Sequence, residues 1–227
     1  MPVVLAIETS QRRGSVALLD TAGTVRVREL DEGRRAADTL MPTIDSLVHE
    51  AGLTPDALDV VGVSIGPGGF TGLRIAVSTA KMLALALRAR IVPVPSTAVV
   101  AEGCDNAAVG AGPIMIALAS KRETVWAERY RREDDGLWTS ESPGALFDAA
   151  LAPVSGCSAV VGDEHVPASL VQRCETHGIR IVEPVLTATA CLALTLRRLN
   201  EPPVDPRALV PLYPRPPEAV RLWEKRT

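Results

Sequence analysis

The chain has 227 residues, a formal net charge of −3 and an apolar fraction of 47%. This length exceeds one average domain and suits two small ones, and the apolar fraction is ordinary for a globular protein with a packed core. The 24 Lys and Arg residues are dispersed along the chain and are outnumbered by 27 Asp and Glu residues. A basic surface that binds nucleic acid by itself is therefore not indicated.

The cysteines and the N-terminal sequence indicate the cellular compartment in which the protein is expected to act. Cys104, Cys157, Cys174 and Cys191 form no Cys-x-x-Cys pair and are typical of buried or half-buried free thiols in a reducing environment. No basic N-terminal region precedes an apolar stretch, and no apolar run reaches about 18 residues without interruption. We therefore expect a cytoplasmic protein without a signal peptide or a membrane span.

Three strands are predicted at the N-terminus, over residues 3–8, 15–20 and 25–30. Turn residues separate these apolar segments, and the short connections imply antiparallel neighbours. The pattern then changes to a helical period over residues 36–51. Pro42 lies about one turn into this segment and either starts the regular helix or kinks it. The apolar face of this helix consists of Leu40, Ile44, Leu47, Val48 and Ala51.

A glycine-rich loop lies between the next predicted strand, residues 60–65, and a second helix, residues 72–89. Backbone N–H groups at such a turn often receive an anion. The spacing is not that of a dinucleotide-binding fingerprint, because Thr71 stands where the third glycine should be, and no Gly-Lys-Ser/Thr follows as in a P-loop. A tight structural turn and a phosphate cradle both remain open. This signature loop consists of Gly66, Pro67, Gly68, Gly69, Phe70, Thr71 and Gly72, with Arg74 just beyond it.

The second predicted helix is apolar around most of its circumference. Its charges, Arg74, Lys81 and Arg88, are spaced by seven and form one narrow stripe. The helix is either enclosed within one domain or carries an exposed apolar patch that binds a partner, and we favour the patch. The expected interface residues on the two helices are Leu40, Ile44, Leu47, Val48, Leu73, Ala76, Val77, Ala80 and Ala84.

The second half of the chain has fewer clear elements. Strands are predicted over residues 114–119, 124–130, 159–162 and 179–182, and a helix over 187–199. We expect an N-terminal module over residues 1–105 that carries the partner helices and a smaller module over residues 106–205. A proline-rich linker leads into a tail over residues 206–227, which returns toward the first module.

Residue types that carry catalysis are sparse. His49, His165 and His177 form no His-x-x-x-His or His-Glu-x-x-His pair, which argues against a metal site. No local pattern pairs a nucleophile with a base. We expect no catalytic residue, no bound cofactor and no metal in the isolated chain.

Four segments resemble one family in their order and spacing. They are residues 5–10 (Leu-Ala-Ile-Glu-Thr-Ser), residues 40–45 (Leu-Met-Pro-Thr-Ile-Asp), the signature loop, and residues 211–215 (Pro-Leu-Tyr-Pro-Arg). They resemble the bacterial dimerisation subunits of tRNA threonylcarbamoyladenosine synthesis, the glycoprotease-like TsaB family, formerly YeaZ. The resemblance covers the whole chain, strongly in residues 1–100 and weakly between 105 and 205.

This resemblance implies an α/β fold with two actin-like ATPase (ribonuclease H-like) modules, each with a mixed sheet, the second module being reduced. It implies a non-catalytic scaffold subunit that binds and activates an ATPase-like transferase subunit, TsaD-like, in a heterodimer. That complex modifies the N6 of adenosine 37 in tRNAs reading codons that begin with A. The resemblance also implies a homodimer when the chain is alone, a small P-loop ATPase as a further partner, and contact with tRNA only through the complex. ATP or ADP and metal are expected on the partner subunit.

The chain departs from related patterns at three places. Glu8, Thr9 and Ser10 lie where actin-like kinases hold Asp-x-Gly-Thr for Mg²⁺ and phosphate, but here the carboxylate is one methylene longer and the glycine is displaced. Ala36-Ala37-Asp38 replaces His-Ser-Glu of the family, and residues 119–122 (Ala-Ser-Lys-Arg) replace Asp-Ala-Arg-Arg. The alternatives are a small-molecule kinase or ATPase of the same fold, and a homodimeric binding protein with another client.

Overall fold

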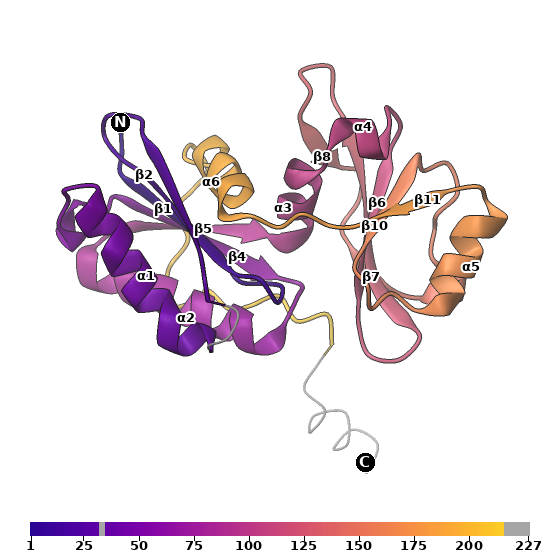
Figure 1. Ribbon diagram of the computed structural model, residues 1–227, viewed down its shortest axis with the longest axis horizontal. Helices are drawn as coiled ribbons and strands as arrows, with labels where there is room; N and C mark the ends of the chain where they lie inside the picture. Colours follow the sequence, from indigo (N-terminus) through magenta and orange to yellow (C-terminus); the bar gives the residue numbers. More distant parts are fainter. Residues whose placement is uncertain (32–34, 216–227) are drawn as a thin grey trace, which may run out of the picture.

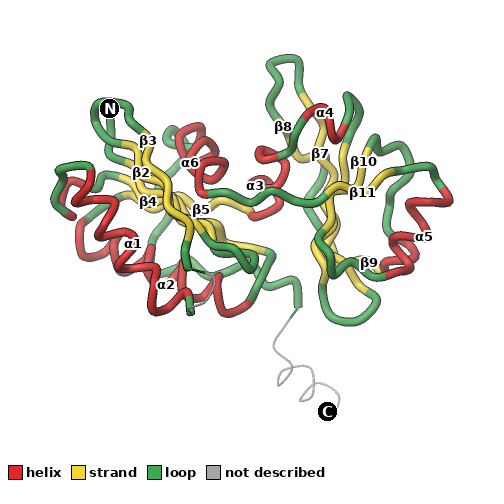
Figure 2. Tube along the Cα trace, viewed as in Figure 1, coloured by secondary structure: helices red, strands yellow, loops and turns green. Residues whose placement is uncertain are grey.

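The computed structural model describes residues 1–31 and 35–215, which form two modules side by side (Figure 1). Each module is built around one β-sheet with helices on its faces (Figure 2). The two-module α/β fold predicted from the sequence is thereby confirmed.

The first sheet has the strand order β3-β2-β1-β4-β5. Pairs β1–β2 and β2–β3 are antiparallel, as the short turns predict, whereas β4 and β5 run parallel to β1. The parallel pairs need long connections, and helices supply them. The strands are β1 (Val4–Glu8), β2 (Ser15–Leu19), β3 (Val25–Glu29), β4 (Val60–Gly66) and β5 (Arg90–Pro95).

Helices cover both faces of this sheet (Figure 1). Helices α1 (Ala36–Glu50) and α2 (Phe70–Leu87) pack on one face, and α3 (Ser96–Gly103) and α6 (Ala188–Arg197) on the other. Along β1, Leu5 belongs to the core under α1 and α2, whereas Ala6 belongs to the core under α6. Since both faces are buried, the central strands are mostly apolar along their length rather than alternating.

Helix α6 lies in the first module, although the sequence analysis assigned residues 106–205 to the second. It packs directly on β1, β2, β4 and β5. Gly62 of β4 permits this close approach, because a Cβ there would lie less than 3.0 Å from the side chain of Thr195. The assignment was wrong because sequence order does not reveal that the chain crosses back.

The second sheet has the order β11-β10-β6-β7-β8, with β9 also paired to β7. Helix α5 (Ala168–Thr176) covers one of its faces, and the short α4 (Asn106–Val109) and α3 lie at the other. Short 3-10 turns occur at Pro55–Ala57 and Ala149–Leu151. The strands are β6 (Ile114–Ala119), β7 (Thr124–Arg132), β8 (Trp138–Ser140), β9 (Ala145–Asp148), β10 (Ala159–Gly162) and β11 (Arg180–Val182).

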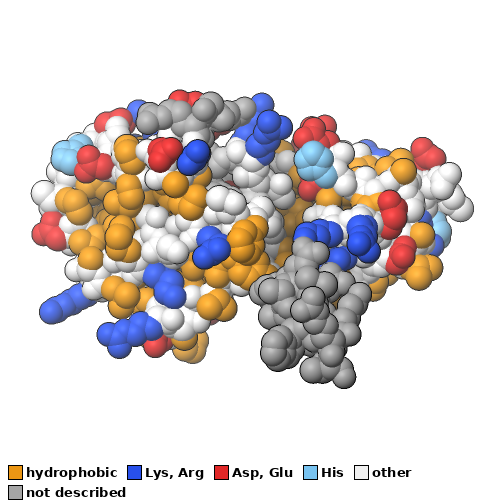
Figure 3. All heavy atoms as spheres, turned by 90° about the horizontal axis from the view of Figure 1, so that it is seen from below, with side chains coloured by type: hydrophobic (Ala, Val, Ile, Leu, Met, Phe, Trp, Pro, Cys, Tyr) orange, Lys and Arg blue, Asp and Glu red, His pale blue; other side chains and the backbone are white. Residues whose placement is uncertain are grey.

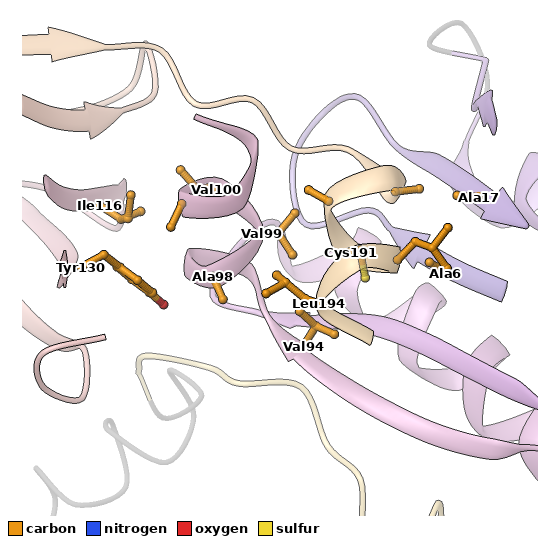
Figure 4. Close-up of a cluster of buried hydrophobic side chains, with 14 of the residues drawn as sticks. Ala6, Ala17, Val94, Ala98, Val99, Val100, Ile116, Tyr130, Cys191 and Leu194 are labelled. Atoms are coloured by element: carbon orange, nitrogen blue, oxygen red, sulfur yellow. The ribbon is translucent and has the colours of Figure 1, made fainter. Parts of the chain in front are cut away.

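Helix α3 joins the two modules. Figure 4 shows its residues Val99 and Val100 between Cys191 of α6 and Ile116 of the second sheet. The Tyr130 hydroxyl lies 3.1 Å from Thr97 Oγ1, which in turn donates to Glu128 at 2.7 Å. A continuous apolar core and a buried polar contact therefore fix one module against the other.

Helix α2 is long and apolar enough to cross a membrane by length and composition alone, whereas the sequence predicts no membrane span. Its buried residues, including Leu73, Ala76 and Ala80, cover the first sheet beside α1. This packing accounts for its apolar composition. Pro42 lies inside α1 and does not start it.

The close contact between β4 and α6 predicts that adding one methyl group at position 62 destabilises the protein. Gly62→Ala forces a Cβ into Thr195, and such overpacking should lower the free energy of unfolding by roughly 1–3 kcal/mol. Urea denaturation measures the loss, and combining the change with Thr195→Gly should restore part of it. Unchanged stability of Gly62→Ala would show that α6 does not pack on β4 in this way.

Candidate functional site

The signature loop is fixed to the first module by its backbone. Gly66 has a φ of 110°, which favours glycine, and the Gly66–Pro67 peptide bond is cis. The Gly66 N–H donates to Ser96 Oγ at 3.1 Å, and the Gly69 N–H donates to the Ser10 carbonyl at 2.6 Å. The Gly69 N–H, at the helix N-terminus where an anion would bind, already has a protein acceptor. The structure thus favours the tight turn over the phosphate cradle.

Gly68 and Gly72 are needed for close approach to the β1–β2 turn. A Cβ on Gly68 would lie less than 3.0 Å from the Ser10 carbonyl oxygen, and one on Gly72 equally close to that of Thr9. The Thr9 hydroxyl also donates to the Gly72 carbonyl at 2.9 Å. Backbone φ is not what requires Gly68 and Gly72, because only Gly66 of the loop has a positive φ.

Phe70 is the first residue of α2 and lies at the surface. Its side chain is 57% exposed and contacts Tyr213 of the tail, with ring centroids 5.0 Å apart. The Arg74 guanidinium lies 5.1 Å from the centre of the same Phe70 ring. Phe70 therefore links the loop to residues 211–215, another of the four segments that resemble the family.

The described part of the tail joins both modules. The Leu212 N–H donates to the Ile65 carbonyl of β4 at 2.7 Å. Lys81 Nζ donates to the carbonyls of Arg207 and Leu209 at 3.1 and 2.9 Å. At the far end, Arg215 donates to Thr124 Oγ1 and to the Lys121 carbonyl of the second module. Residues 207–215, called the tail segment below, thus run from α2 to the second sheet.

The expected interface residues are not on the surface. All nine belong to the interior of this chain, and none is more than 3% exposed. Their side chains cannot meet a partner, because the apolar face of each helix packs on the chain's own sheet. The buried residues are Leu40, Ile44, Leu47, Val48, Leu73, Ala76, Val77, Ala80 and Ala84.

A different set of side chains forms the outer face of α1 and α2. Met41, Met82 and Leu85 are 37%, 51% and 50% exposed. Figure 3 views the molecule from this side and shows apolar side chains spread over the first module. We call this surface the α1–α2 outer face. The charges of the two helices differ in sign: α1 exposes Asp38, Asp45 and Glu50, whereas α2 carries Arg74 and Lys81 and is followed by Arg88.

Glu8 is completely buried. Its Oε1 accepts from the Ser10 N–H at 2.6 Å, while Oε2 has no hydrogen-bond partner. Burial raises the pKa of this carboxyl above 4.5, and nearby polar groups of Ser10 and Ser64 offset only part of the effect. A closed-in carboxyl of this kind does not reach a cleft where Mg²⁺ or phosphate could bind.

A cleft of about 640 Å³ lies between the modules, near the β1–β2 turn. Arg12 and Arg13 line it together with Glu29, Asp163 and Glu183. Glu8 does not line it. Within residues 1–31 and 35–215, no group of three or more His, Cys, Asp or Glu side chains could hold a metal ion.

The cysteines are free thiols, as predicted. Cys157, Cys174 and Cys191 are buried, and burial raises the pKa of each. The pKa of Cys104 is raised to about 11 by the same cause. None of these thiols is therefore an activated nucleophile at neutral pH.

A sequence profile of the family described as TsaD, tRNA N6-adenosine threonylcarbamoyltransferase, matches residues 32–147, just over half of the chain. The chain belongs to this family. The predicted resemblance to TsaB, or YeaZ, is confirmed by the relatives that follow.

Among curated proteins, Escherichia coli TsaB, named for tRNA threonylcarbamoyladenosine biosynthesis, is 29% identical over 145 residues. That match covers 63% of this chain and 62% of the E. coli protein. An uncharacterized protein of Mycobacterium bovis is also 29% identical, over 95% of this chain and 93% of its own length. A Pseudomonas aeruginosa crystal structure described as YeaZ has a TM-score of 0.79 and 25% identity, and covers 94% of this chain and 100% of its own.

The loop provides a comparison among three neighbouring glycines. Gly68→Ala and Gly72→Ala should each lower the free energy of unfolding by roughly 1–3 kcal/mol, because the new Cβ meets a backbone oxygen. Gly69→Ala is the matched control, since its Cβ would meet only the Ser10 oxygen at an ordinary 3.5 Å. Urea denaturation of the three variants makes the comparison. Equal stability of all three would mean that the loop does not press on the β1–β2 turn.

The burial of Glu8 predicts that the free energy of unfolding depends on pH. A carboxyl whose pKa is raised on folding contributes stability that is complete below 4.5 and is lost as the pH rises through its folded-state pKa. The free energy of unfolding of the wild type should therefore fall with rising pH relative to that of Glu8→Gln. Urea denaturation of both proteins at a series of pH values from below 4.5 upward measures this difference. If the free energies of unfolding of the two proteins change in parallel with pH, Glu8 is not a buried, titrating carboxyl.

Proposed function

We propose that this chain is a non-catalytic subunit that binds and supports an ATPase-like, TsaD-like transferase subunit. The proposed reaction of that complex is threonylcarbamoylation of the N6 of adenosine 37 in tRNAs reading codons that begin with A. The observation that carries the proposal is the α1–α2 outer face, which exposes large apolar side chains in a chain similar to TsaB. Large apolar side chains on one exposed surface are typical of a protein–protein contact.

The outer face suits a partner with the same two helices. An acidic α1 beside a basic α2 is self-complementary when a two-fold axis places α1 of each copy opposite α2 of the other. The proposed homodimer of the isolated chain uses this pairing. A homologous transferase subunit that presents similar helices would compete for the same surface.

Two features of the described residues favour a non-catalytic role for this chain. Glu8 is enclosed, and the described residues offer no metal-binding cluster. The proposal therefore assigns ATP or ADP and metal to the transferase subunit. It includes a small P-loop ATPase as a further partner, tRNA contact through the complex, and action in the cytoplasm.

Charged substitutions on the outer face test this proposal. In Met82→Glu/Leu85→Glu, two carboxylates enter a contact that excludes water, so affinity for the transferase subunit should fall roughly tenfold or more. Isothermal titration measures the affinity, and analytical ultracentrifugation measures self-association. Ala80→Arg is unsuitable, because Ala80 is 0% exposed and the variant would disrupt the core.

Leu151→Glu is the matched control, because Leu151 is 71% exposed but lies in the second module. It should retain wild-type affinity. A wild-type chain that binds no transferase subunit, or an outer-face variant that binds normally, would contradict the proposed function. Turnover of ATP or another small molecule by the isolated wild type would favour the kinase alternative.

A further inference from the structure

A groove of about 570 Å³ runs along the flank of α2 where the two modules and the tail segment meet. Phe70, Arg74, Val77 and Lys81 form its α2 wall, at the spacing of one helical stripe. Residues 209–215 form the opposite wall, and Ser120 and Lys121 of the second module close one end. The groove adjoins the α1–α2 outer face, because Ser78 lines it and lies one turn before exposed Met82.

The described residues that line this groove include four cations and no Asp or Glu. The cations are Arg74, Lys81, Lys121 and Arg215, and they come from three separate parts of the chain. This local excess contrasts with the overall net charge of −3. In Figure 3, basic side chains lie on both sides of an apolar patch near the middle of the face. The groove is therefore complementary to an anionic occupant.

The hydrogen-bonding groups of the groove are mostly donors. Lys81 gives two of its three N–H bonds to tail-segment carbonyls, and Arg74 lies against the Phe70 ring. Two buried polar atoms of the same wall, Tyr213 Oη and Arg215 Nε, have no hydrogen-bond partner. Unpaired buried donors are costly, and carboxylates are their strongest acceptors in proteins.

Shape and composition favour a peptide as the occupant. The helix rises roughly 16 Å from Phe70 to Lys81, which matches about five residues of extended chain. Val210, which is 67% exposed, and Pro211 supply an apolar wall for the side chains of such a segment. A nucleic acid would require a broad basic surface rather than a narrow, apolar groove.

We propose that this groove binds a short acidic segment, with interspersed apolar side chains, of the transferase subunit that occupies the α1–α2 outer face. The inference rests on the proposed function and adds a second, electrostatic contact to it. Carboxylates of the segment face the four cations that line the groove, and its apolar side chains contact Val210 and Pro211. The contact thus reaches both modules at once.

Charge reversal tests the electrostatic part. Arg74→Glu/Lys121→Glu should bind the transferase subunit roughly tenfold more weakly at about 50 mM salt, and its affinity should depend less on salt than that of the wild type. Arg131→Glu/Arg180→Glu is the matched control, because both residues are exposed and neither lines the groove. Thermal melting of each variant verifies that it folds. Unchanged affinity and salt dependence of the groove variant would overturn the inference.

Photo-crosslinking identifies the occupant. Val210, which is 67% exposed, is replaced by benzoylphenylalanine, and the purified complex is irradiated and analysed by mass spectrometry. A crosslink to an acidic segment of the transferase subunit is the expected result. Crosslinks only to residues 216–227 of the same chain, to a second copy or to added tRNA, or no crosslink, would each overturn it.

The two proposals fail in different ways. If Met82→Glu/Leu85→Glu abolishes binding while the groove variant binds normally, the inference falls and the proposed function stands. If the wild type does not bind the transferase subunit, both fall.

Discussion

The contact between the signature loop and the β1–β2 turn determines where α2 begins. Gly68 and Gly72 bring their backbones against the carbonyls of Ser10 and Thr9, at a distance that no side chain would permit. The direction of α2 follows, and with it the outer face on one flank and the groove on another. Because Phe70 is the first residue of α2 and contacts Tyr213, the same contact positions the tail segment.

Much of the first module could be predicted from local patterns. Strands β1 to β4 and helices α1 and α2 occur within a few residues of their predicted positions, since their apolar periods are clear. Strand β5 was missed, and it contains Pro93 and Pro95, which are unusual in a strand. Helix α6 was predicted, but its place on the first sheet depends on Gly62 facing Thr195, a contact between distant residues that no local pattern contains.

The site was less predictable than the fold. A helical period correctly identifies the apolar face of α1 and α2, but in a small α/β module that face covers the chain's own sheet. A surface for a partner must consist of the apolar residues that interrupt the polar face, such as Met82 and Leu85. In an almost wholly apolar helix the sequence cannot distinguish these from the buried ones. The enclosure of Glu8 likewise depends on neighbours from β4 and α6 that lie far away in the sequence.

The tail segment helps to fix the orientation of the two modules relative to each other. Helix α3 connects the two sheets through a shared core, and the tail segment forms a second connection, from Lys81 on α2 to Thr124 on β7. Two connections on different sides of the junction restrict rotation more than either could alone. Lys121 is thereby held beside α2, although it belongs to the turn between β6 and β7 of the second module. A surface composed of both modules can bind as one unit only when their relative orientation is fixed, and the α3 core and the tail segment together supply that constraint.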